Sequence, residues 1–349
     1  MGDRAQATEI FEDLGDIFCL TFVKGVSAEE ALRRMGAYPD TLASRTGSQM
    51  LALTDGSDPG RSRLAAAIDL GLWSVVIEPN DFQGIYLVEE VSSGTEALSV
   101  LRHDYALPQV GYAADGAIVG AFDPDFPRFD EMEGADPERL HPFMRAAGFV
   151  PYSEEASGDI DDGKSLLMAM QFTGTTLPLA PLDDARLSAV IEPWFVRLPN
   201  AGDRLSSQFE PQAADLVKAA ERADPRTQRA VAVEEVGRLA SLLNIANTPG
   251  FAEVLGEAAA GVAQPITVSS PLAPYIREWL ERDRRSGLSL EQQALANRYG
   301  WFLTAFRGVL DPDPRRALLA ALRPVGSEPA LFGGRAARMA VLDAMTRSA

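Results

Sequence analysis

The chain has 349 residues, of which 46% are hydrophobic and 23% charged, and its formal net charge at pH 7 is −18. This composition is typical of a soluble globular protein, and its 16 Phe and 4 Trp exclude disorder over the whole length. The excess of acidic residues argues against sequence-independent binding of nucleic acid, which depends on an excess of lysine and arginine.

The first predicted elements are a helix, a buried strand and a second helix. Residues 8–16 favour a short helix with its apolar side chains on one face. Residues 17–23 form a continuous apolar, β-prone run of strand length, which predicts a strand buried on both faces. Ser27 and Glu30 have capping-box spacing, so we expect a helix to begin there and to end before Gly36.

Further strands follow in the same half of the chain. Residues 72–79 form a second apolar run, and residues 97–101 and 109–113 are shorter β-prone segments. Asp115-Gly116 separates two such segments, residues 110–113 and 118–122, which is the strongest short-range signal for a hairpin. Strands joined by hairpins and flanked by helices predict an α+β fold with a mostly antiparallel sheet.

These segments, taken in order, resemble a family of uncharacterised actinobacterial proteins with a domain of unknown function. The resemblance covers about residues 1–195 and agrees with the use of 29 Arg against 3 Lys. Because the family has no assigned activity, the resemblance implies a shared fold and no catalytic residue. The residues that carry it are Phe18 to Gly25, Ala31 to Ala37, Trp73 to Asn80, Asp115-Gly116 and Gly134 to Gly148.

The net negative charge lies in the first part of the chain. Residues 1–201 contain 14 Lys/Arg and 33 Asp/Glu, whereas residues 202–349 contain 18 and 17. This break in composition lies in a turn-rich stretch and predicts an acidic α+β domain at residues 1–200. Amphipathic segments with short, Pro-rich joints predict an all-helical domain at residues 201–349.

One segment matches a phosphate-binding pattern. Gly158 to Ser165 fits G-x-x-x-x-G-K-[ST], and an apolar helix is expected after Lys164. The loop contains three aspartates, which would repel a polyanion, and no apolar strand precedes it. We therefore expect an acidic linker before a helix, with P-loop nucleotide binding as the less favoured alternative. The same loop lacks the glutamate that closes a calcium loop, so no metal site is predicted.

Residue types that enzymes commonly use are scarce. The single cysteine, Cys19, falls inside the first predicted strand, where a thiol serves as a small apolar side chain. Glu78 at a strand end, together with His103 and Asp104, forms the alternative acid/base set of an enzyme without a recognisable motif. No catalytic residue, cofactor or metal ion is assigned.

An acidic loop after the hairpin supplies the favoured functional prediction. Dense negative charge accelerates association with cationic surfaces. We therefore expect a non-enzymatic, immunity- or adaptor-like interaction protein that binds a basic protein partner, with neither nucleic acid nor membrane as a partner. The N-terminus lacks a signal-peptide pattern and no apolar run has membrane-spanning length, so a cytoplasmic location is expected, and the oligomeric state is left open. The predicted partner surface consists of Asp123, Asp125, Asp130, Glu131 and Glu133.

Overall fold

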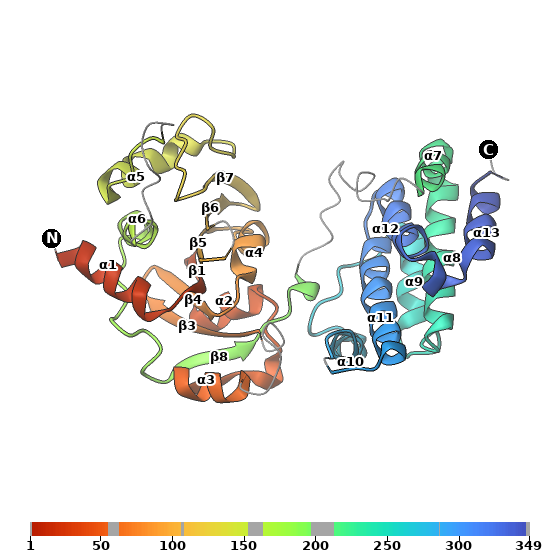
Figure 1. Ribbon diagram of the computed structural model, residues 1–349, viewed down its shortest axis with the longest axis horizontal. Helices are drawn as coiled ribbons and strands as arrows, with labels where there is room; N and C mark the ends of the chain where they lie inside the picture. Colours follow the sequence, from red (N-terminus) through yellow and green to blue (C-terminus); the bar gives the residue numbers. More distant parts are fainter. Residues whose placement is uncertain are drawn as a thin grey trace. The chain divides into compact units, whose positions relative to one another are not determined.

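The computed structural model describes residues 2–54, 63–105, 108–152, 163–196, 213–285 and 287–346. The chain separates into two units, Met1–Val196 and Arg197–Ala349. The first contains one eight-stranded sheet with helices on both faces, and the second consists mostly of helices (Figure 1). The predicted fold class, α+β followed by a helical part, is confirmed.

The sheet of the first unit is antiparallel throughout. Its strands are β1 (Ile17–Lys24), β2 (Ala43–Arg45), β3 (Leu64–Leu70), β4 (Trp73–Pro79), β5 (Glu96–His103), β6 (Gln109–Ala114), β7 (Ala117–Phe122) and β8 (Arg186–Val190). They lie in the order β2-β8-β3-β4-β1-β5-β6-β7. Strand β1 lies between β4 and β5, and its register places Cys19 opposite Glu78 on one side and opposite Leu101 on the other.

Burial on both faces explains why β1 is an uninterrupted apolar run. Every residue from Phe18 to Val23 is buried. Because side chains alternate between the faces of a strand, Phe18, Leu20 and Phe22 enter one core cluster, whereas Val23 enters the cluster on the opposite face. The prediction that this strand is buried on both faces is confirmed.

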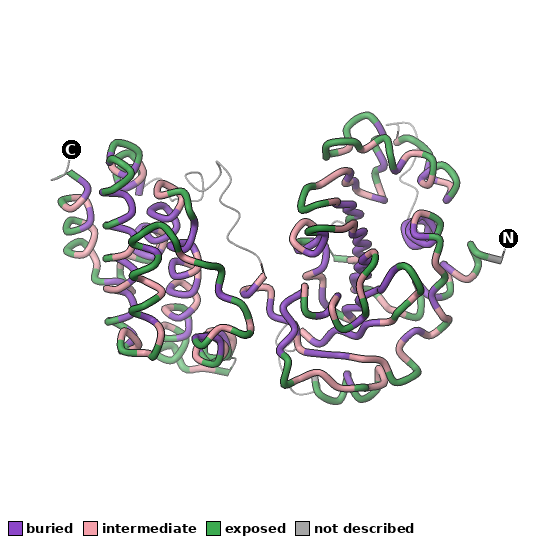
Figure 2. The backbone as a smooth tube through the Cα atoms, turned by 180° about the vertical axis from the view of Figure 1, so that it is seen from behind, coloured by how far each residue is buried: buried purple, intermediate pink, exposed green. Residues whose placement is uncertain are grey.

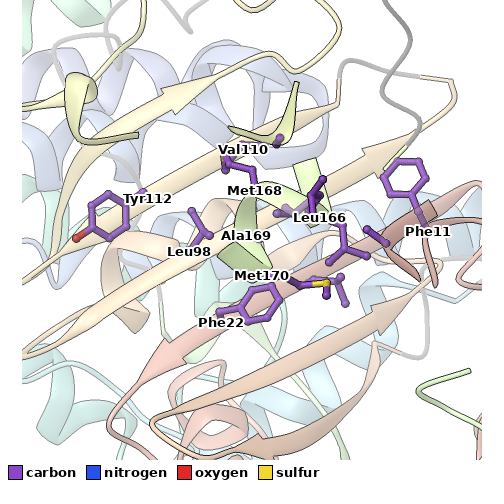
Figure 3. Packing of buried hydrophobic residues seen from close by; sticks show 14 of the residues in the cluster. Phe11, Phe22, Leu98, Val110, Tyr112, Leu166, Met168, Ala169 and Met170 are labelled. Carbon is purple, nitrogen blue, oxygen red and sulfur yellow. The ribbon is translucent and has the colours of Figure 1, made fainter. Parts of the chain in front are cut away.

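Two groups of helices cover the two faces of the sheet (Figure 1). Helices α1 (Gly2–Asp13), α5 (His141–Ala147) and α6 (Lys164–Thr173) contribute to the cluster on one face. Helices α2 (Ala28–Arg34) and α4 (Gln83–Val91) contribute to the cluster on the other face. Figure 3 shows side chains of the first cluster from α1, the strands and α6 gathered together. The remaining helical segments of this unit are α3 (Gly47–Thr54) and the 3-10 turns Pro39–Thr41, Pro137–Leu140 and Pro193–Phe195.

The second unit is built from amphipathic helices around an aromatic core. The rings of Trp279, Phe302 and Phe306 pack against one another, with centroid separations between 5.4 and 6.4 Å. Figure 2 shows buried and exposed residues alternating along these helices. Within the described residues, none of the helices combines the length and apolar character needed to cross a bilayer. The helices are α7 (Ala214–Arg222), α8 (Pro225–Leu242), α9 (Phe251–Ala260), α10 (Ala273–Asp283), α11 (Leu290–Val309), α12 (Pro314–Ser327) and α13 (Gly334–Thr346), with a 3-10 turn at Pro329–Phe332.

The predicted hairpin is the connection between β6 and β7. Asp115 and Gly116 have φ angles of 49° and 82°, and a two-residue turn with both angles positive matches the twist of antiparallel strands. The Gly116 N–H also donates to the Ser92 hydroxyl at 3.0 Å, which ties the turn to the end of α4. The Asp-Gly prediction is therefore confirmed.

Some elements differ from the predictions. Strands β2, β3 and β8 and helices α3 and α4 are not predicted from the sequence, and the first helix begins at Gly2 and ends at Asp13 instead of covering residues 8–16. Strand β3 has the sequence LAAAIDL, and alanine is depleted in strands, so it carries a weak β signal. It forms a strand because β4 and β8 pair with it on both sides.

Candidate functional site

The loop that contains the predicted acidic surface returns to the edge of the sheet. Ala121 and Glu133 exchange two backbone hydrogen bonds, of 2.8 and 3.1 Å. Gly134 follows with a φ angle of +125°, and a Cβ added there would lie 2.4 Å from the Val119 carbonyl oxygen. Only glycine allows this approach, so the position of Glu133 at the edge of β7 is fixed by the backbone.

The loop begins with a turn made by Asp123. Its Oδ1 accepts the backbone N–H of Asp125 at 2.9 Å, an arrangement that aspartate commonly forms in turns. The Asp123 side chain is half-buried, and this burial raises the pKa of its carboxyl group above the ordinary value.

A pocket of about 480 Å³ lies between this loop, strands β6 and β7, and helix α4. We call it the acidic pocket. Its apolar lining includes Ile85 and Val88 of α4, Gly111 of β6, and Ile118 and Ala121 of β7. Gly111 lets α4 pack closely on β6, since a Cβ added there would lie 3.2 Å from Ile85 Cδ1 and 3.6 Å from Val88 Cγ1. The polar lining includes Asp123, Arg128, Glu131 and Glu133.

Acidic groups outnumber basic groups around the acidic pocket. Among its described lining residues, Arg128 supplies the one guanidinium, which pairs with Glu131 at 2.9 Å and lies 5.3 Å from the centre of the Tyr152 ring. The Glu133 carboxylate is exposed and makes no ion pair within the described part of the chain. Asp123 and Glu133 therefore leave the pocket with an excess of negative charge.

The structure brings together part of the predicted partner surface. Asp123, Glu131 and Glu133 all line the acidic pocket. Asp125 is half-buried in the turn and Asp130 is exposed, and neither belongs to the lining. The apolar lining was not predicted from the sequence. The available signal was Gly111 inside a β-prone run, because glycine within a strand often marks the close approach of another group.

Glu78, the central residue of the alternative acid/base set, lies completely buried at the end of β4 beneath the first turn of α4. Its Oε1 accepts the Gln83 N–H at 2.9 Å and its Oε2 accepts the Gly84 N–H at 2.8 Å. Phe82, at the N-cap position, makes no side-chain capping bond, so Glu78 caps α4 instead. A Cβ on Gly84 would lie 2.0 Å from Thr21 Oγ1, which explains the glycine at this position.

The surroundings of Glu78 are polar but sealed from solvent. Burial, reinforced by the negative charge of Asp81, raises the pKa of Glu78 to about 8. Three more buried polar groups lie on the same face: Ser99 Oγ is 3.2 Å from Cys19 Sγ and 3.0 Å from Thr21 Oγ1. Burial also raises the pKa of the Cys19 thiol, which disfavours its reactive thiolate form.

The other two members of the acid/base set lie at the end of β5. His103 Nδ1 accepts the Tyr105 N–H at 3.2 Å, and its ring packs edge-on against Phe82 at 5.4 Å. Asp104 pairs with Arg102 at 3.0 Å. Over the residues that the structure describes, no hydrogen bond or ion pair joins Glu78 to His103 or Asp104. The acid/base set remains a prediction.

The P-loop-like segment is described only in part. Residues 158–162 lie outside the described residues, whereas Gly163, Lys164 and Ser165 form the start of α6. Lys164 and Ser165 are buried, with 5% and 1% of their surface exposed. The helix predicted after Lys164 is confirmed. No group of three or more His, Cys, Asp or Glu side chains in the described ranges is placed to hold a metal ion.

The fold and the pocket define the first unit as an α+β module, with an acidic pocket at one edge of an eight-stranded antiparallel sheet. A model described as a family of unknown function, DUF6461, matches residues 5–193, and the chain belongs to this family. The predicted resemblance to an uncharacterised family is thereby confirmed over nearly the predicted range. Comparisons with curated proteins and with solved structures find no match.

Proposed function

We propose that this protein is a non-enzymatic interaction protein whose N-terminal unit binds a basic protein partner at the acidic pocket. The observation that carries the proposal is the pocket itself, which combines an apolar lining with an excess of carboxylates. An acidic surface alone is usually only solvated. A concave surface that adds apolar area to the negative charge also gains free energy from excluding water.

The charges and the apolar lining would have different roles in binding. The carboxylates of Asp123 and Glu133, whose charge the Arg128–Glu131 pair does not offset, attract a cationic surface over several ångströms and so raise the association rate. The apolar residues Ile85, Val88 and Ile118 provide contacts that form only after docking and so slow dissociation. This division supports a partner that is basic and carries side chains long enough to enter the pocket.

The alternative, an enzyme that uses Glu78, has one observation in its favour. A carboxyl group with a pKa raised to about 8 is protonated near neutral pH, as a general acid must be. However, both Glu78 oxygens already accept backbone N–H groups, and the side chain is fully buried. Burial and the nearby Asp81 account for the raised pKa without any catalytic role, and the capping of α4 explains why a carboxyl group lies there, so we favour the interaction protein.

The proposal extends to the cellular setting. The proposal includes an immunity- or adaptor-like role in the cytoplasm, and the cytoplasmic setting is supported by the single cysteine, which permits no internal disulfide. An actinobacterial origin is supported by the preference for Arg over Lys.

A charge-matched pair of variants tests the proposal. The variant D123N/E131Q/E133Q removes three negative charges at the pocket, and E9Q/E12Q/D13N removes three from exposed positions on α1, on the other face of the sheet. The probe is a short peptide containing both Arg and Lys, measured by isothermal titration calorimetry at low salt. The pocket variant is expected to lower affinity by roughly tenfold or more, and the α1 variant by much less. Equal effects of the two variants would contradict the proposal.

A further inference from the structure

The acidic pocket has features that suit one particular side chain, and this inference rests on the proposed function. We infer that the pocket receives a single arginine side chain of the basic partner. The aliphatic stem would lie along Gly111 and Ile85, and the guanidinium would lie beside Asp123 and Glu133.

The lining matches the stem of a long cationic side chain. The pocket volume of about 480 Å³ accommodates one long side chain together with water. Gly111 and Ala121 lie opposite each other in the register of β6 and β7, and both have little or no side chain. Ile85 and Val88 supply the apolar wall above them. Arginine and lysine side chains commonly bury their methylene groups along such surfaces and keep the charged end in a polar setting.

The rim matches the charged head. The Arg128 guanidinium already pairs with Glu131, so Asp123 and Glu133 carry the negative charge that remains. Asp123 accepts the Asp125 N–H within its own turn, and an ionised carboxylate has acceptor positions for further donors. Two carboxylates on one rim suit a group with several N–H donors in a fixed plane, as in guanidinium.

An aromatic ring at the same rim favours arginine over lysine. Phe126 lines the pocket and is 44% exposed. A guanidinium is planar and weakly hydrated, and it stacks on aromatic faces more readily than a strongly hydrated ammonium does. The same chemistry occurs beside the pocket, where Arg128 of the loop lies over the ring of Tyr152, which follows α5. The combination of two carboxylates and an exposed ring in the same lining therefore selects arginine.

The test fills the pocket without changing its charge. Ala121 is a half-buried lining residue of β7, and Ala121→Leu places a larger side chain in the pocket. The control, Ala117→Leu, makes the same substitution at an exposed position of β7 outside the lining. Three peptides that differ at one position, which is arginine, lysine or neutral citrulline, are titrated into each variant. Circular dichroism and thermal unfolding verify that both variants fold. Gly111→Ala, whose added Cβ would press on Ile85 and shift that wall of the pocket, serves as a second variant of the lining.

We expect wild type and A117L to bind the arginine peptide roughly tenfold more tightly than the lysine peptide. The citrulline peptide should bind more weakly than either. A121L and G111A should remove that preference. If arginine and lysine bind equally to the wild type, or if both filled variants keep the preference, the inference is wrong. The proposed function is tested separately. If D123N/E131Q/E133Q loses peptide binding while A121L and G111A bind the peptides as wild type does, the acidic surface is supported and the arginine pocket is not.

Discussion

At the scale of single residues, Glu78 shows how a buried carboxyl group can be structural. It is fully buried, yet it satisfies two N–H groups of α4 that would otherwise lack partners beneath the helix. The same burial gives it a pKa of about 8, against an ordinary value of 4.5. The folded protein therefore holds this proton more tightly than the unfolded chain does.

This difference predicts a specific dependence of stability on pH. The contribution of Glu78 is fully present below pH 4.5 and is lost as pH rises through about 8, because the ionised form must then stay buried. The total loss is about 5 kcal/mol in the free energy of unfolding. The free energy of unfolding in urea is measured as a function of pH, with pulsed hydrogen exchange of residues 73–79 as the probe. It should decline with rising pH in wild type and change much less in E78Q. Parallel profiles for the two proteins would contradict the assignment.

The role of a residue can be predicted from the sequence when it depends on neighbouring residues in the chain, and not when it depends on contacts with a distant element. Glu78 was selected from the sequence because it ends a strand, but its contact with α4 was not foreseen, since Gln83 and Gly84 resemble no capping motif. Cys19 was predicted to be buried because its neighbours in the strand are apolar, and it is completely buried. A residue's burial follows from its immediate neighbours, whereas its hydrogen-bond partners depend on where the next element packs.

At the scale of elements, strong local patterns gave correct predictions and weak ones gave none. Strand β1 is continuously apolar and the hairpin has an Asp-Gly turn, and both were predicted. Strand β3 is rich in alanine and was missed, because its pairing with β4 and β8 outweighs its low β propensity. The acidic pocket was missed for a related reason, since its walls come from α4, β6, β7 and the loop together.

The return of the acidic loop gives a prediction at this scale. Gly134→Ala places a Cβ in contact with the Val119 backbone and must shift the segment that holds Glu133 against β7. The net charge stays the same. We expect weaker binding of the arginine peptide by roughly tenfold, with a loss of stability of about 1–3 kcal/mol. Calorimetric titration and thermal unfolding measure the two effects, with Gly256→Ala as the control, because a Cβ at Gly256 meets nothing within 4 Å. Unchanged peptide affinity in G134A would show that the loop position does not matter.

At the scale of the whole molecule, the net charge of −18 is a local property. The acidic residues are concentrated in the first 201 positions, and the family match over residues 5–193 covers the same part of the chain. The helical unit has nearly balanced charge, and its core includes the packed rings of Trp279, Phe302 and Phe306. The proposed binding of a basic partner therefore concerns the first unit, which holds the acidic pocket.

The central claim is that the acidic pocket binds a basic partner by its charge, and the salt dependence of binding tests it most directly. Dissociation constants of the arginine peptide are measured over a series of salt concentrations for wild type, D123N/E131Q/E133Q and E9Q/E12Q/D13N. Screening weakens interactions between exposed charges, so we predict steep salt dependence for wild type and the α1 variant, and a much shallower one for the pocket variant. Equal slopes for all three proteins would contradict the claim.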